Sequence, residues 1–143
     1  MISVKAHIKN VALHHTIFDL PFAFMAAFLA AGGEPALKDL FWIAMAITTG
    51  RAAALALDNL ADMKFDSQQP RMAERAMVTG VISKNEAKIF IVSCLVLMIV
   101  SVYQLQPICI YLLPLAAAPF LLYPFTKRFT NWCHLFLGLA VAM

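Results

Sequence analysis

The chain has 143 residues, of which 62% are hydrophobic and only 13% are charged, and its mean hydropathy is +0.79. These values indicate a membrane protein. The net charge of +3 comes with no run of basic residues, so we expect no nucleic acid among its partners.

Apolar runs, taken in chain order, predict an all-α protein, a multi-pass transmembrane helical bundle formed by a single domain (1–143). Charged and histidine residues precede the first continuous apolar run, so we expect this run to remain as an anchor and not to be cleaved. Four runs are expected to span the lipid bilayer and a fifth is incomplete, with approximate bounds 17–33, 40–57, 89–103, 108–125 and 132–143.

Basic residues orient the predicted spans, because the cytoplasmic loops of membrane proteins collect lysine and arginine. Such residues precede the first span, lie between the second and third, and follow the fourth: Lys5, Lys9, Lys64, Arg71, Arg75, Lys84, Lys88, Lys127 and Arg128. Only Lys38 falls on the opposite side. We therefore expect the N-terminus and these loops to face the cytoplasm, with the protein in the inner membrane.

Common motifs of soluble enzymes are missing from the sequence. It contains no Walker loop, no GxGxxG and no GxSxG, and its four histidines form no HExxH or other zinc arrangement. The cysteines Cys94, Cys109 and Cys133 stand alone in apolar surroundings and are interpreted as small buried hydrophobic side chains. Candidate chemistry is thus confined to the charged cytoplasmic side.

Three aspartates, Asp58, Asp62 and Asp66, stand four residues apart where the second span ends. On a helix, this spacing winds the carboxylates by about 40° per step, which places them in a stripe along one side. They repel one another unless a positive group lies between them, and Mg²⁺ completed by phosphate oxygens meets that need. The predicted ligand is a phosphate or diphosphate. The alternative is a solvated helix end, with carboxylates paired to Lys64 or Arg75.

Basic residues near the aspartates have two interpretations each. Arg51 lies inside the second span, where an unpaired guanidinium is costly, so it either binds an anionic substrate group or pairs with Asp58. Arg71 and Arg75 either cap a diphosphate or only mark the cytoplasmic side.

The cytoplasmic ends of the third and fourth spans also carry local signals. Ser83 followed by Glu86 predicts a capping box that opens a helix, and Gly80 supplies the turn before it. Tyr123 and Lys127, four apart at the end of the fourth span, can project from one helical face toward the aspartates. Lys127 is equally consistent with a topology anchor.

Four segments carry further motifs. They are HTIFDLPFAFMAAFLAAGG (15–33), GRAAALALDNLADMKFD (50–66), QPRMAERAMVTGVISKNEA (69–87) and YPFTKRFTNWCHLFLGLA (123–140). In this order they resemble the N-terminal half of a UbiA-superfamily aromatic prenyltransferase, of the UbiA-like or 4-hydroxybenzoate polyprenyltransferase branch.

The resemblance implies a role for each candidate residue. Asp58, Asp62 and Asp66 would be catalytic and hold Mg²⁺ on a prenyl diphosphate. The diphosphate would be bound by Arg71, Arg75 and Lys127, and the aromatic acceptor by Arg51 and Tyr123. The sequence departs from the family pattern at three positions, which are Asp58 in place of asparagine, Gln69 in place of asparagine and Asp19 in place of a small apolar residue.

The implied reaction transfers a polyprenyl group to the ring of an aromatic acid such as 4-hydroxybenzoate, in ubiquinone or menaquinone biosynthesis. The resemblance also implies further spans and a second aspartate-rich motif, so we expect a fragment with little activity alone, completed by a second half or a homo-oligomer. One alternative is a non-catalytic membrane subunit or ion-binding protein of the same fold. A CDP-alcohol phosphotransferase is less favoured, because its Asp-Gly-x-x-Ala-Arg opening is absent.

Overall fold

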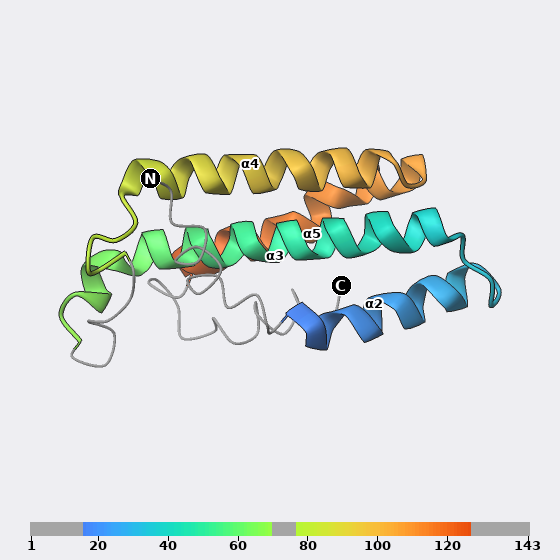
Figure 1. Cartoon of the computed structure of the whole chain (residues 1–143), viewed down its shortest axis with the longest axis horizontal. Coiled ribbons are helices and arrows are strands. Elements are labelled where there is room, and N and C mark those ends of the chain that lie inside the picture. The colour runs from blue at the N-terminus through green and yellow to red at the C-terminus, as the bar shows by residue number, and fades with distance from the viewer. Residues whose placement is uncertain (1–15, 70–76, 127–143) are drawn as a thin grey trace.

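The computed structural model of the chain describes residues 16–69 and 77–126. Within these two ranges the regular structure is entirely helical, which confirms the predicted all-α class. The helices, shown in Figure 1, are α2 (Thr16–Ala30), α3 (Leu37–Asp66), α4 (Lys84–Tyr103) and α5 (Pro107–Thr126).

The helix bounds differ from the expected spans because an apolar run marks the lipid-compatible part of a helix and not the whole helix. Helix α3 continues nine residues beyond the expected 40–57, and α4 begins five residues before the expected 89–103. Helix α2 ends three residues before the expected end of 17–33. The expected incomplete span 132–143 lies outside the described residues.

Two of the described helices are long and apolar enough to cross a bilayer. They are α3 over Leu37–Met63, with 27 residues, and α4 over Lys84–Tyr103, with 20 residues. Helix α2 and the part of α5 from Pro107 to Ala118 are apolar but shorter. The number of membrane crossings therefore remains a prediction.

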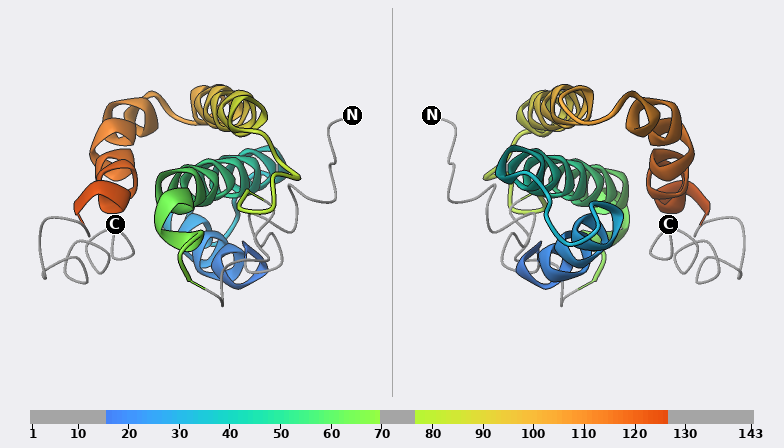
Figure 2. Two further views of the ribbon diagram at one scale, coloured as in Figure 1. Left: turned by 90° about the vertical axis from the view of Figure 1, so that its left-hand side faces the viewer. Right: turned by 90° about the vertical axis from the view of Figure 1, so that its right-hand side faces the viewer.

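Helix α3 lies at the centre of the described part of the chain and contacts α2, α4 and α5. The end-on views in Figure 2 show α2 and α4 on opposite sides of α3, with α5 to one side. At about 1.5 Å per residue, the 30 residues of α3 extend for about 45 Å, more than the roughly 30 Å of a hydrocarbon core. One helix can thus join the apolar interior to an end beyond the lipid.

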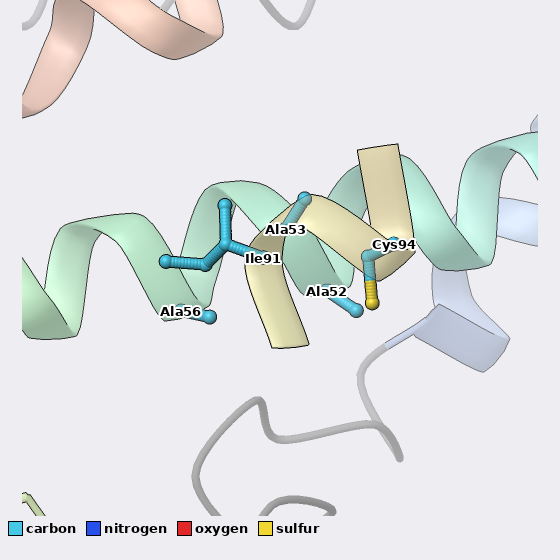
Figure 3. Packing of buried hydrophobic residues seen from close by; sticks show 5 residues of the cluster. All are labelled: Ala52, Ala53, Ala56, Ile91 and Cys94. Atoms are coloured by element: carbon cyan, nitrogen blue, oxygen red, sulfur yellow. The ribbon is translucent and has the colours of Figure 1, made fainter. Parts of the chain in front are cut away.

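Small side chains allow α3 and α4 to approach closely. Ala52, Ala53 and Ala56 are buried against Ile91 and Cys94 of α4, as Figure 3 shows. Alanine and glycine are typical of helix contacts in membranes, where close backbone approach supplies the packing energy. This contact fixes the second half of α3 against α4.

The turn before α4 has the predicted chemistry. The Glu86 N–H donates to Ser83 Oγ at 3.2 Å, and the Ser83 N–H donates to Glu86 Oε2 at 2.9 Å, so the capping box is confirmed. Gly80 adopts a φ of +76°, a backbone conformation that residues other than glycine rarely adopt. Met77 and Ile82 of this turn are buried and pack with Leu60 and other residues beside the end of α3.

Buried hydroxyl groups in the apolar helices bond to backbone of their own helix. Thr49 Oγ1 donates to the Met45 carbonyl at 2.7 Å, and Ser101 Oγ donates to the Leu97 carbonyl at 2.8 Å. Such bonds satisfy a hydroxyl where no water is present. These two side chains are therefore explained by structure alone.

Gly50 of α3 faces Met98 of α4, and substitution there tests the packing. A Cβ at Gly50 would lie 2.9 Å from Met98 Sδ, the flexible end of a long side chain. We expect Gly50→Ala to leave the thermal unfolding temperature nearly unchanged, because Met98 can move and alanine improves helix propensity by about 1 kcal/mol. Gly50→Leu should destabilise the protein by about 1–3 kcal/mol in detergent.

The double variant Gly50→Leu/Met98→Ala serves as the control. It should recover part of the lost stability, since it removes the side chain that the leucine meets. A Gly50→Leu variant that unfolds at the same temperature as the unsubstituted protein would contradict the close contact.

Candidate functional site

The three aspartates lie on one continuous helix, at the end of α3. Asp58 and Asp62 are partly exposed, whereas Asp66, the last residue of α3, is 7% exposed. The Asp66 carbonyl accepts a hydrogen bond from the Gln69 N–H at 3.1 Å, which turns the chain at the helix end. The stripe therefore runs from the apolar part of α3 to its last turn.

Helix geometry limits how the stripe can hold a metal. Neighbouring aspartates are separated by about 6 Å along the axis, and Asp58 and Asp66 by about 12 Å, so these two cannot share one ion directly. Among the residues that the structure describes, no group of three or more His, Cys, Asp or Glu side chains is placed to hold a metal. The stripe can offer one or two carboxylates to each ion, which fits Mg²⁺ completed by phosphate oxygens and water.

Arg51 forms a salt bridge with Asp19, which connects the middle of α3 to the first turn of α2. The bridge joins Arg51 Nη1 to Asp19 Oδ2. Both side chains are partly exposed, at 33% for Arg51 and 43% for Asp19. Arg51 lies inside the apolar stretch Leu37–Met63, where a paired charge costs far less than an isolated one.

The salt bridge corrects one sequence-based alternative. Asp58 was considered as the ion-pair partner of Arg51, but the carboxylate that Arg51 contacts is Asp19. Asp58 lies seven residues further along α3, which separates it from Arg51 by about 10 Å along the helix axis. Asp19 lies on the neighbouring helix α2, within salt-bridge distance of Arg51. In the sequence, Asp19 stands out only as a departure from a family pattern. The missed signal is that two opposite charges in neighbouring apolar helices are expected to pair.

The salt bridge leaves one N–H donor of Arg51, Nε, without a hydrogen-bond partner in the described part of the chain. Nε is buried and makes no hydrogen bond within residues 16–69 and 77–126. A buried donor without a partner is costly, especially on a charged group, and calls for a physical explanation. Arg51 is thus neutralised by Asp19 but not fully hydrogen-bonded.

The remaining predicted site residues are only partly placed. Tyr123 belongs to α5, which contacts α3, so the two helices that carry Tyr123 and the aspartates are neighbours. Arg71, Arg75 and Lys127 lie outside the described residues. The structure therefore brings Arg51 and the aspartates onto one helix and leaves the diphosphate-binding role of these three basic residues as a prediction.

Comparison with known proteins identifies the family of the chain. Residues 20–143 match the model of the UbiA prenyltransferase family. The chain is 37% identical over 114 residues to the 4-hydroxybenzoate octaprenyltransferase of Shewanella loihica (strain ATCC BAA-1088 / PV-4), which covers 80% of this chain and 40% of that protein. It is 35% identical over 115 residues to the enzyme of the same name from Actinobacillus pleuropneumoniae serotype 5b (strain L20), covering 80% and 39%.

A solved structure shares the fold. The apo structure of a UbiA homolog from Aeropyrum pernix K1 superimposes with a TM-score of 0.82 at 35% sequence identity, over 90% of this chain and 46% of that one. This chain therefore spans less than half the length of these similar proteins. With the family match extending over most of its sequence, it belongs to the UbiA prenyltransferase family.

Proposed function

We propose that the chain is part of a membrane prenyltransferase that moves a polyprenyl group from a Mg²⁺-bound prenyl diphosphate to an aromatic acid such as 4-hydroxybenzoate, in quinone biosynthesis. Its family membership and the names of its relatives support this function. The observation that carries the proposal is the aspartate stripe of α3, which follows a paired arginine on the same helix.

The aspartates are proposed to hold the diphosphate through Mg²⁺. Bound Mg²⁺ supplies charge neutralisation to the departing diphosphate. Asp62 and Asp66, with Asp58 beside them, provide carboxylate oxygens for it. Because Asp58 and Asp62 are partly exposed, a phosphate group can approach them from outside α3.

Basic and aromatic residues are proposed to complete the site. Arg71, Arg75 and Lys127 donate hydrogen bonds to the diphosphate and offset its charge. Arg51 binds the carboxylate of the acceptor, and Tyr123 contributes to the acceptor side. The contact between α5 and α3 supports a shared site for Tyr123 and the aspartates.

The polyprenyl chain is proposed to lie among the apolar helices, which are in contact with the lipid bilayer. Large apolar side chains of α2 and α5 are exposed, among them Ile17, Phe22, Tyr111 and Leu115. Such surfaces suit lipid, an isoprenoid chain or further helices. Because the relatives are much longer, we expect this chain alone to turn over little, and a second half or another copy to complete the enzyme.

A non-catalytic membrane subunit or ion-binding protein of the same fold is the alternative. A protein with this alternative function would have the same helices and belong to the same family, but it would not need to bind a prenyl diphosphate. Ligand binding therefore separates the two functions even if the chain alone is a poor enzyme. The family match gives no support to a CDP-alcohol phosphotransferase.

Asp62→Ala tests the proposed metal site. The purified chain in nanodiscs should bind geranyl diphosphate when Mg²⁺ is present and lose that binding when the metal is chelated. Asp62→Ala should weaken binding by about ten- to a hundred-fold, since a charged contact contributes about 1.5–3 kcal/mol. Isothermal titration calorimetry measures both effects.

Asp39→Ala is the matched control, because Asp39 is a partly exposed carboxylate at the opposite end of α3. It should leave binding of geranyl diphosphate within about two-fold, as expected for a distant site. Equal loss in both variants, or binding independent of Mg²⁺, would count against the proposed site and in favour of the non-catalytic alternative.

The proposed orientation places the end of α3 in the cytoplasm. In a background without native cysteines, Ser67→Cys and Glu34→Cys introduce thiols at exposed positions near opposite ends of α3. A membrane-impermeant maleimide should label Ser67→Cys only in inside-out vesicles and Glu34→Cys only in intact spheroplasts. The reverse pattern would show that the aspartates face the periplasm.

A further inference from the structure

The salt bridge between Arg51 and Asp19 engages Nη1 and leaves the buried Nε without a hydrogen-bond partner among the described residues. A guanidinium has five N–H donors in a planar fork and can bind a carboxylate along more than one edge. Asp19 occupies Nη1, while Nε, on the edge away from Nη1, is buried and has no partner among the described residues. Arg51 is therefore anchored at Nη1, while its Nε donor is enclosed without a partner among the described residues.

The edge formed by Nε and Nη2 has the chemistry of a carboxylate receptor. Nε and Nη2 together form a side-on fork, and a planar group with two acceptor oxygens satisfies both donors at once. An unpaired donor is costly where water is excluded, and Nε is buried. A ligand that accepts a hydrogen bond from Nε removes this cost and therefore binds more tightly. Arg51 precedes Asp58 by seven residues, so a ligand at Arg51 lies about 10 Å along α3 from the stripe, on nearly the same side.

We propose that Asp19 is a positioning residue, which holds Arg51 by Nη1 so that its Nε edge is presented to the carboxylate of the acceptor. This inference rests on the proposed function and extends it to an acceptor-selecting residue on α2. Asp19 also neutralises the charge of Arg51, so the net charge of the pair attracts an anion only weakly. Selection then depends on the two-oxygen geometry of the ligand. A carboxamide, which replaces one acceptor oxygen by a donor, is rejected by the same fork.

The inference predicts a change in acceptor binding without a change in diphosphate binding. In Asp19→Asn the anchor loses its charge, and Arg51 is free to turn away from the acceptor. Binding of 4-hydroxybenzoate should weaken by about ten-fold or more, because a charge-assisted hydrogen-bond arrangement is lost. Binding of geranyl diphosphate with Mg²⁺ should stay within about two-fold. Asp19→Glu should retain most of the acid binding, and Asp39→Asn serves as the matched control.

The experiment uses the full chain in nanodiscs, with calorimetric titration of 4-hydroxybenzoate, 4-hydroxybenzamide and Mg²⁺ with geranyl diphosphate as separate ligands. The expected result is preference for the acid over the amide in the unsubstituted chain and loss of that preference in Asp19→Asn. Unchanged or tighter acid binding in Asp19→Asn overturns the inference, since Asp19 would then be neutral or a competitor. Equal weakening of all three ligands also overturns it and assigns Asp19 a structural role.

A charge-swapped variant, Asp19→Arg/Arg51→Asp, separates stability from positioning. Restoring the ion pair should raise thermal stability relative to Asp19→Arg alone. Binding of the acid should stay weak, because the guanidinium then extends from α2 and is no longer at position 51 of α3. Recovery of acid binding in the swapped variant would contradict the inference. Failure of the unsubstituted chain to bind geranyl diphosphate with Mg²⁺ would instead count against the proposed function. Diphosphate binding without acid binding overturns the Asp19 inference alone.

Discussion

Charged side chains on an otherwise apolar helix have to be neutralised or placed beyond the lipid, and α3 does both. Its single arginine in the apolar stretch is paired with Asp19 of α2, which ties the two helices together. Its three aspartates follow towards the end of the helix, and Asp66 lies beyond the apolar stretch Leu37–Met63. The positions of α2 and of the candidate site therefore follow from the same electrostatic constraint.

Close packing against α4 supports α3 on the side opposite α2. Ala52, Ala53 and Ala56 are buried against α4, and the turn that precedes α4 packs beside Leu60. A helix held along both sides keeps its charged groups at fixed heights and angles. Sites on such elements position ligands more reliably than sites on loops.

Sequence reasoning anticipated the features that depend on local chemistry. The all-helical class follows from long apolar runs, and the capping box of Ser83 and Glu86 follows from a short-range pattern. The partner of Arg51 was not anticipated, because it depends on which helix faces α3, and a single sequence does not specify that contact. The length of α3 was underestimated for a related reason: Asp58, Asp62 and Asp66 end an apolar run without ending the helix.

The most direct test of the account is to locate the bound metal. Fe²⁺ can replace Mg²⁺ and, with ascorbate and peroxide, generates hydroxyl radicals that cleave the backbone close to the ion. With geranyl diphosphate present, mass spectrometry should find cleavage concentrated between Asp58 and Asp66, and this cleavage should disappear when the diphosphate is omitted. Cleavage elsewhere on α3, or cleavage that does not depend on the diphosphate, would contradict a metal and diphosphate site formed by the aspartate stripe.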